Sequence, residues 1–248
     1  MNGQVGLFGD AVEFSRKKQP KITVLPVSVV DVYKNVRGNH SDSDSSRSDF
    51  SRFPSEVSDL SYELFLRGCK DIFDPFAGWG ERHYKAIQHN KNYTGYDISA
   101  RAVGQAEIEY GVANTLADSS VAQIPIFDGL LTCPPYWNLE IYSDVGIEQI
   151  RTFDEFICIL GDVFRRCFDV CLSGGVFCIL VGNWRKNGTY YDLSFAVKNI
   201  FRDMGALTID CVVISRRQKT KVKVLIPQAV RLGYTVNLHE ELLVFAKP

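Results

Sequence analysis

The sequence predicts an α/β protein built on a doubly wound, mostly parallel sheet. From residue 60 onward, short apolar runs alternate with segments whose apolar residues recur at helical spacing. One run, Val176–Val181, is apolar throughout, which is typical of a strand covered on both faces at the centre of a parallel sheet. In such sheets ligands bind beyond the carboxyl ends of the strands, so functional residues are expected there.

Residues 1–52 are predicted to form an extension that precedes the main domain at 53–248. Ile22–Tyr33 has the composition of one or two short strands interrupted by Pro26. Residues 38–52 are rich in Ser and Asp and contain almost no apolar side chains, so burial cannot offset the entropy lost on ordering. We expect a flexible loop there, or a segment that orders on a ligand or partner.

The main domain is predicted to alternate strands and helices. The expected strands are 71–73, 93–96, 114–116, 129–132, 176–181, 207–215 and 238–245, and the expected helices are 81–89, 100–110, 152–172 and 189–204. Ser99 is placed to cap the helix that follows it. Since no helix is expected between the last two strands, they can pair antiparallel.

Three signals set the ends of the two later helices. Thr152 and Glu155 have the spacing of a capping box. The Gly-Gly pair at 174–175 is expected to end the helix that begins there, at about residue 172. Thr189 and Asp192 are spaced like a second capping box, which would start the last helix.

The composition excludes several classes of protein. The chain has 28 Lys and Arg against 29 Asp and Glu, a formal net charge of −1, which excludes binding of polyanions by bulk charge but leaves room for a local basic patch. No apolar run approaches the ~20 residues of a membrane span, and the N-terminus lacks a signal pattern. The seven cysteines contain no CxxC pair, so we expect reduced thiols, no metal site, and a cytoplasmic protein without a membrane partner.

The first candidate site is the turn Asp74-Pro-Phe-Ala-Gly-Trp-Gly80, between a predicted strand and a predicted helix. Gly78 and Gly80 allow a tight turn and the close approach of a ligand, and the helix N-terminus favours electron-rich groups. The alternative is a strand-to-helix turn without a ligand.

Two acids follow the next strands. Asp97 ends the strand at 93–96, where an acid can accept hydrogen bonds from ribose hydroxyl groups. Asp118 follows the strand at 114–116, where it could accept from the exocyclic amine of an adenine. The alternatives are an ordinary acid at a helix N-terminus and an ordinary loop acid.

The segment Cys133-Pro134-Pro135-Tyr136-Trp137 follows the predicted strand at 129–132. Two prolines and two aromatic residues predict a rigid lip with exposed ring faces, which can stack a base taken out of its helix. The Pro134 carbonyl is free to accept a hydrogen bond from an amino group. The alternative is a rigid turn in the core.

A basic segment lies between the last two predicted strands. It has six cations and no acid from 216 to 231. The cations are Arg216, Arg217, Lys219, Lys221, Lys223 and Arg231. Contact with phosphates is the functional interpretation, and a solvated loop is the alternative.

Together these motifs resemble those of the S-adenosylmethionine-dependent amino-methyltransferases of DNA, which modify adenine N6 or cytosine N4. The family pattern is DPFxGxG, followed by Asp, Asn or Ser before Pro-Pro-Tyr/Phe/Trp. The chain is more closely similar to phage- and prophage-associated methylase-like proteins with a CPPYxxLExYS segment, which here is 133–143. The likeness continues through 181–185 and 239–245 and covers roughly 53–248.

The resemblance implies a Rossmann-like methyltransferase fold, S-adenosylmethionine as cofactor, DNA as partner, and direct displacement on a flipped base without a metal. It also implies roles for individual residues. Around the cofactor, Asp74, Phe76, Gly78 and Gly80 would surround the methionine part, Asp97 the ribose and Asp118 the adenine. The target base would be held by Cys133, Pro134, Pro135 and Tyr136. The candidate contacts with nucleic acid are Trp137, Arg185 and the basic segment from Arg216 to Lys223.

Cys133 departs from the family pattern, because a thiol is a weak hydrogen-bond acceptor. It is a tolerated substitute beside the Pro134 carbonyl, a mark of an inactive binding protein, or a nucleophile toward a pyrimidine ring. Three other functions stay open: an RNA amino-methyltransferase, a catalytically silent subunit that binds nucleic acid for a partner, and an unrelated nucleotide-binding α/β protein. The sequence does not predict the oligomeric state or the modified base.

Overall fold

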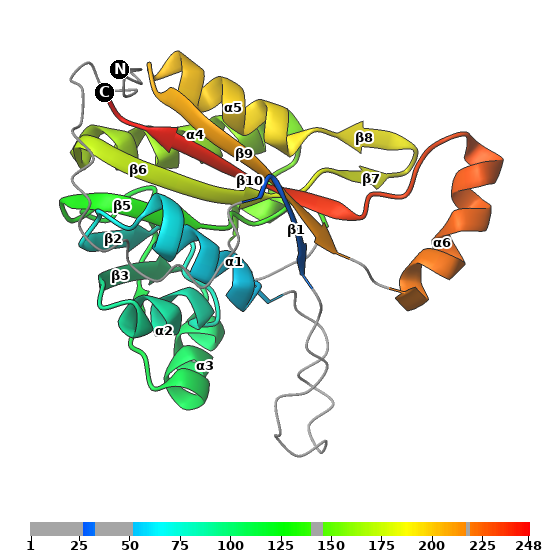
Figure 1. The fold of residues 1–248 in the computed structure, drawn as a ribbon. Coiled ribbons are helices and arrows are strands. Elements are labelled where there is room, and N and C mark those ends of the chain that lie inside the picture. Colours follow the sequence, from blue (N-terminus) through cyan, green and yellow to red (C-terminus); the bar gives the residue numbers. More distant parts are fainter. Residues whose placement is uncertain (1–26, 33–51, 140–145, 217–218) are drawn as a thin grey trace, which may run out of the picture.

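An eight-stranded sheet is the centre of the computed structural model, which describes residues 27–32, 52–139, 146–216 and 219–248 (Figure 1). The strand order is β1-β9-β10-β6-β5-β2-β3-β4. The strands are β1 (Val29–Val32), β2 (Asp71–Asp74), β3 (Asn92–Asp97), β4 (Thr115–Leu116), β5 (Phe127–Thr132), β6 (Cys171–Val181), β9 (Leu207–Arg216) and β10 (His239–Ala246).

Neighbouring strands of this sheet run parallel, except that β10 is antiparallel to both β6 and β9. The predicted sheet, mostly parallel with an antiparallel last strand, is therefore confirmed. The expectation that no helix separates the last two strands is wrong, because α6 (Lys219–Leu232) lies between them. β1 confirms one strand within Ile22–Tyr33, and it joins the sheet edge beside β9.

Helices cover both faces of the sheet. They are α1 (Ser55–Leu60), continued by the π-helical turn η2 (Ser61–Phe65), α2 (Glu81–Gln88), α3 (Ala100–Tyr110), α4 (Phe153–Val170) and α5 (Leu193–Asp203). Along β6, Phe177 and Ile179 pack with α4 and α5, whereas Cys178 and Leu180 pack with α1 and α2. This alternation follows from the two-residue period of a strand and explains why the run 176–181 is apolar throughout. No helix within the described ranges combines the length and apolarity that crossing a membrane requires.

The end of α4 differs from its prediction. Gly174 and Gly175 lie inside β6, which begins immediately after the helix, so they do not end it. Instead the Lys247 ammonium group donates to the carbonyl oxygens of Phe168, Asp169 and Cys171. A cation on the last carbonyls satisfies acceptors that a helix leaves open at its C-terminus.

A hairpin replaces the predicted start of the last helix. β7 (Trp184–Lys186) pairs antiparallel with β8 (Thr189–Tyr191), so the second capping box is wrong at Thr189. Asn187 and Gly188 turn the hairpin, and both have positive φ, as the tightest hairpin turns require. Asp192 does cap α5, since its side chain accepts from the Phe195 amide at 3.1 Å. The caps predicted at Ser99 and Thr152 are confirmed.

Several predictions fall outside the described residues. The loop predicted at 38–52 does so except for Arg52, and so do residues 140–143 of the CPPY segment and Arg217. The domain boundary after residue 52 stays a prediction.

Candidate active site

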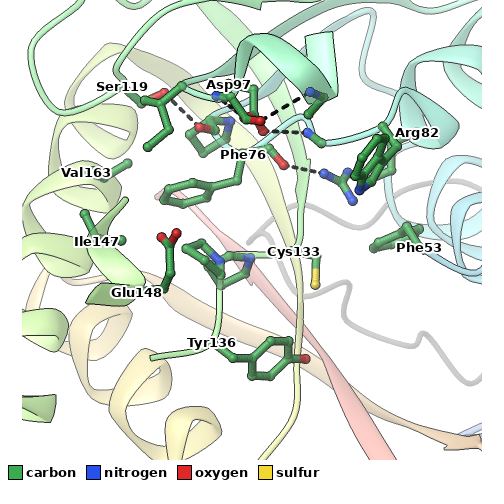
Figure 2. Close-up of a pocket in the computed structure, with 18 of the residues that line it drawn as sticks. Phe53, Phe76, Arg82, Asp97, Ser119, Cys133, Tyr136, Ile147, Glu148 and Val163 are labelled. Atoms are coloured by element: carbon green, nitrogen blue, oxygen red, sulfur yellow. Dashed lines mark hydrogen bonds between the residues drawn. The ribbon is translucent and has the colours of Figure 1, made fainter. Parts of the chain in front are cut away.

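One pocket opens where β2, β3, β4 and β5 end, at the carboxyl edge of the parallel strands (Figure 2). Its empty volume, which includes space open to solvent at the mouth, is about 1240 Å³. The walls are formed by Arg52 and Phe53, by Pro75, Phe76, Gly78, Trp79, Glu81 and Arg82 around the turn after β2, and by Asp97–Ser99, Arg101, Ala102, Asp118–Ser120, Cys133–Tyr136, Ile147, Glu148, Val163 and Glu240.

Asp74 fixes the turn after β2 from within the core. Its carboxylate is fully buried, and each oxygen accepts two hydrogen bonds. Oδ1 accepts from the Phe76 amide at 3.0 Å and the Thr132 hydroxyl at 2.6 Å. Oδ2 accepts from the Tyr93 hydroxyl at 2.6 Å and Arg82 Nε at 2.5 Å. Asp74 does not line the pocket, so its influence on a ligand passes through the turn that it holds.

Arg82 closes the same network from the first turn of α2. Its guanidinium group donates to the Phe76 carbonyl at 2.5 Å and lies 4.7 Å from the centre of the Phe53 ring. Burial lowers the pKa of Arg82, but Asp74, Tyr93 and Cys133 together outweigh burial, so the pKa of Arg82 is raised. The backbone of Phe76 is therefore held at both its amide and its carbonyl, and its ring is presented to the pocket.

The two glycines of the turn have different roles. Both have positive φ, 58° at Gly78 and 96° at Gly80. A Cβ at Gly80 would lie 2.8 Å from Ala106 Cβ and 2.9 Å from Val112 Cγ2, so this glycine permits close packing against α3 and does not line the pocket. Gly78 lines the pocket, and its amide donates to Asp97 at 2.8 Å.

The predicted acids at the ends of β3 and β4 both reach the pocket. Asp97 accepts from the Gly78 amide on one oxygen and from the Ser99 amide on the other, each at 2.8 Å. Burial raises the pKa of Asp97, and these two hydrogen bonds act against that shift. Asp118 accepts from the Ser120 amide at 2.8 Å. A carboxylate oxygen has two acceptor positions, so both acids can also accept from a ligand.

The residues Cys133, Pro134, Pro135 and Tyr136 line the opposite part of the pocket. The Tyr136 hydroxyl donates to Glu240 Oε1 at 3.0 Å. The contact spans the end of β6, where a Cβ on Gly182 would lie 3.2 Å from that hydroxyl and 3.1 Å from Glu240 Cγ. Tyr136 is thus anchored by an acid 104 positions away in the chain.

Trp137 is not part of this lip. Its side chain is only 8% exposed, its indole donates to the Ile150 carbonyl at 2.6 Å, and its ring packs on Phe153 and Tyr191. The exposed ring face predicted for Trp137 is therefore wrong. Its indole and ring are used inside the aromatic cluster that supports the turn.

Arg185, predicted to contact nucleic acid, is not part of the pocket wall. The Arg185 guanidinium lies between the rings of Tyr190 and Tyr234, 4.8 Å and 4.9 Å from their centres. Arg216 ends β9, and α6 carries Lys219, Lys221 and Lys223. Because β9 and β6 are both antiparallel to β10, α6 follows a carboxyl end at the same edge of the sheet as the pocket.

Several pocket residues were missed from the sequence. They include Arg52, Glu81, Arg82, Arg101, Ile147 and Glu148. Glu81 directly follows Gly80, whereas Phe53 and Glu240 lie in segments of the resemblance, 53–64 and 239–245, but were given no role in the site. Burial raises the pKa of Glu81, and its Oε1 atom, 3.7 Å from the Arg52 guanidinium, has no hydrogen-bond partner among the residues that the structure describes. The pocket walls carry five acids and three arginines. Carboxylates accept hydrogen bonds and are negatively charged, so this excess of acids fits a ligand with hydroxyl groups and positive charge.

No protein-family model and no curated protein sequence matches the chain. Solved structures do match its fold. The [4+2]-cyclase SpnF matches with a TM-score of 0.56 and 16% identity, over 82% of this chain and 84% of SpnF. The N-methyltransferase NodS from Bradyrhizobium japonicum WM9, in complex with S-adenosyl-L-homocysteine, matches with 0.53 and 13%, over 79% and 88%.

TrmN from Thermus thermophilus matches with a TM-score of 0.51 and 14% identity over 79% of this chain, which spans about half of TrmN, 49%. At such identities the likeness shows a shared arrangement of helices and strands and nothing more. The chain has the Rossmann-like methyltransferase fold.

Proposed function

We propose that the protein is an S-adenosylmethionine-dependent methyltransferase that modifies an exocyclic amine of a DNA base, adenine N6 or cytosine N4. The observation that carries this proposal is one shared pocket: the turn after β2 and Asp97 form one part of its wall, and Cys133–Tyr136 form another. The motifs that resemble DNA amino-methyltransferases are therefore close enough for a methyl donor and a base to meet.

The cofactor would occupy the part of the pocket formed by the ends of β2, β3 and β4. Asp97 would accept from the ribose hydroxyl groups and Asp118 from the adenine amine, while Phe76 and Gly78 would border the methionine part. Bound S-adenosylmethionine supplies a methyl group on a positively charged sulfur. NodS, which has this fold, was solved in complex with S-adenosyl-L-homocysteine, the demethylated form of the proposed cofactor, and this supports a cofactor of this class.

The target base would lie against Cys133–Tyr136. The Pro134 carbonyl would accept one hydrogen of the amine, and the Tyr136 ring would stack on the base. Together these contacts aim the amine lone pair at the methyl carbon, so orientation supplies most of the rate. A base inside a duplex cannot reach this pocket, so the protein must act on a flipped or unpaired base.

Mass analysis of nucleosides tests the proposal directly. Purified protein is incubated with S-adenosylmethionine and either DNA or RNA, and the nucleosides are then separated and weighed. N6-methyladenine or N4-methylcytosine from DNA supports the proposal. Methylation of RNA alone identifies an RNA enzyme, and cofactor binding without methylation of either identifies a silent subunit.

Replacing Cys133 with serine is expected to retain methylation within about fivefold of the wild-type rate, because a hydroxyl accepts a hydrogen bond better than a thiol. Initial rates of methyl transfer check this result. The covalent alternative predicts complete loss in Cys133→Ser and a trapped protein–DNA adduct in the wild type, visible on a denaturing gel.

Replacing Lys219, Lys221 and Lys223 together with glutamine is expected to weaken DNA binding. Each lost phosphate contact lowers the slope of log K against log salt by about 0.9, so three contacts lower it by about 2.7. Binding measured at several salt concentrations gives the slope. The control variant Arg165→Gln/Arg202→Gln removes two exposed cations from α4 and α5. An equal change of the salt slope in both variants would mean that α6 is not the part of the protein that contacts DNA.

A further inference from the structure

We propose that Glu148 recognises the charge of the cofactor, with its carboxyl group facing the positively charged sulfur of S-adenosylmethionine. This inference rests on the proposed function, since it assigns a residue within the same pocket. Its consequence is a protein that distinguishes the methyl donor from the demethylated product, S-adenosylhomocysteine, by charge.

Glu148 lies where the cofactor and base parts of the pocket meet. It belongs to the short 3-10 helix η3 (Ile147–Gln149), lines the pocket and is only 2% exposed. Figure 2 shows its carboxyl group pointing into the space below the Phe76 ring. In the proposed reaction the methyl group passes from the cofactor sulfur to the base amine at this junction. A carboxyl group placed there therefore lies near the sulfur.

The backbone around Glu148 leaves room for this carboxyl group. A Cβ on Gly146 would lie 2.0 Å from Glu148 Oε2 and 2.2 Å from Oε1. Gly146 has φ −73°, a value that any residue adopts, so its conformation does not demand glycine. The Asn138 amide donates to the Glu148 carbonyl at 2.9 Å, which ties η3 to the segment after Tyr136. Gly146 and Asn138 thus hold the acid beside the base-binding turn.

The charges of the pocket favour a cationic ligand. The arginines on its walls are engaged elsewhere: Arg82 with Asp74 at 2.5 Å, Arg52 with Glu109 at 2.7 Å, and Arg101 over the Trp79 ring at 5.7 Å. The other acids of the wall come from other elements. Asp97 ends β3, Asp118 follows β4, Glu81 adjoins Arg52, and Glu240 accepts from Tyr136.

Methyl transfer removes the charge that Glu148 would recognise. The amine lone pair forms the new N–C bond, the C–S bond breaks, and its electron pair stays on sulfur as a neutral thioether. The positive charge passes to the methylated amine, which then releases a proton to the surrounding water. The attraction between the carboxyl group and the sulfur is then lost. The product is consequently held less tightly than the donor, which favours its exchange for a new cofactor.

Calorimetric titration with S-adenosylmethionine and, separately, with S-adenosylhomocysteine tests this inference without measuring activity. Glu148→Gln, a neutral substitution of similar shape, is expected to raise the Kd for S-adenosylmethionine by about tenfold or more. The Kd for S-adenosylhomocysteine is expected to change by less than about threefold.

Gly146→Ala provides a second variant, because the three atoms nearest to the added Cβ all belong to the carboxyl end of Glu148. It is expected to show the same selective loss. The control is Glu240→Gln, which removes an equal charge from the base end and should leave the ratio of the two Kd values unchanged.

Equal weakening of both ligands by Glu148→Gln, or no weakening, would overturn the inference and leave the proposed function intact. The first result would assign Glu148 to a part of the cofactor common to both molecules. A wild-type protein that binds neither ligand would overturn the proposed function itself, and the inference with it.

Discussion

Replacing Arg82 with methionine is expected to lower the free energy of unfolding by about 3–5 kcal/mol, because it leaves a buried carboxylate without its cationic partner. Asp74 is fully buried, the Arg82 side chain is 6% exposed, and their closest N–O distance is 2.5 Å. The Tyr93 and Thr132 hydroxyl groups would still donate to Asp74. Neither of them carries a positive charge, so neither replaces the guanidinium.

Urea denaturation of the purified variants measures this effect. The matched control is Lys85→Met on the same helix, where the ammonium group pairs with Asp59 at 2.9 Å and both side chains are more than 20% exposed. Exposed pairs contribute about 1 kcal/mol or less. If Arg82→Met costs no more than Lys85→Met, the Asp74 network is not what holds the turn after β2.

The same substitution links stability to binding. Arg82 donates to the Phe76 carbonyl, and Asp74 accepts from the Phe76 amide. Loss of this pair therefore loosens the residue that presents its ring to the pocket. Asp74, which lies too deep to line the pocket, still acts on the site by fixing the backbone of the turn.

Much of the site could be predicted because parallel strands bring their carboxyl ends to one edge. Phe76, Asp97, Asp118 and Cys133–Tyr136 each follow a strand that the sequence predicts, and the structure gathers them around one pocket. No such rule applies to Glu240, which lies at the start of an antiparallel strand and reaches Tyr136 across Gly182. Contacts of this kind depend on strand order, which a sequence alone does not determine.

The incorrect predictions also have physical causes. The glycines at 174–175 predict the end of the preceding helix, but they belong to the strand that follows it. The C-terminus of α4 is capped instead by Lys247, from the far end of the chain. The Asn187-Gly188 pair is a typical hairpin signal. The sequence prediction follows the capping pattern at Thr189 instead, and the structure forms the hairpin. For Trp137, aromatic character predicted exposure, whereas its partners Phe153 and Tyr191 come from elements whose packing could not be foreseen.

Replacing Tyr136 with alanine is expected to slow base methylation by about 10–100-fold, because stacking of a base on an aromatic ring is worth about 1–3 kcal/mol. The Kd for the cofactor should change by less than about threefold, since Asp97 and the turn after β2 are untouched. Single-turnover transfer of a labelled methyl group to DNA measures the rate, and calorimetry measures the Kd.

Tyr136→Phe separates the two roles of this side chain. It keeps the ring, which packs edge-on against Trp184 at 5.6 Å, and removes the hydroxyl that donates to Glu240. If stacking dominates, the phenylalanine variant stays within about tenfold of the wild-type rate and well above alanine. Equal rates for the two variants would mean that the hydrogen bond to Glu240, and with it the orientation of the ring, contributes more than the ring surface. The base would then be aligned by an acid that lies two strands away from Cys133 in the sheet.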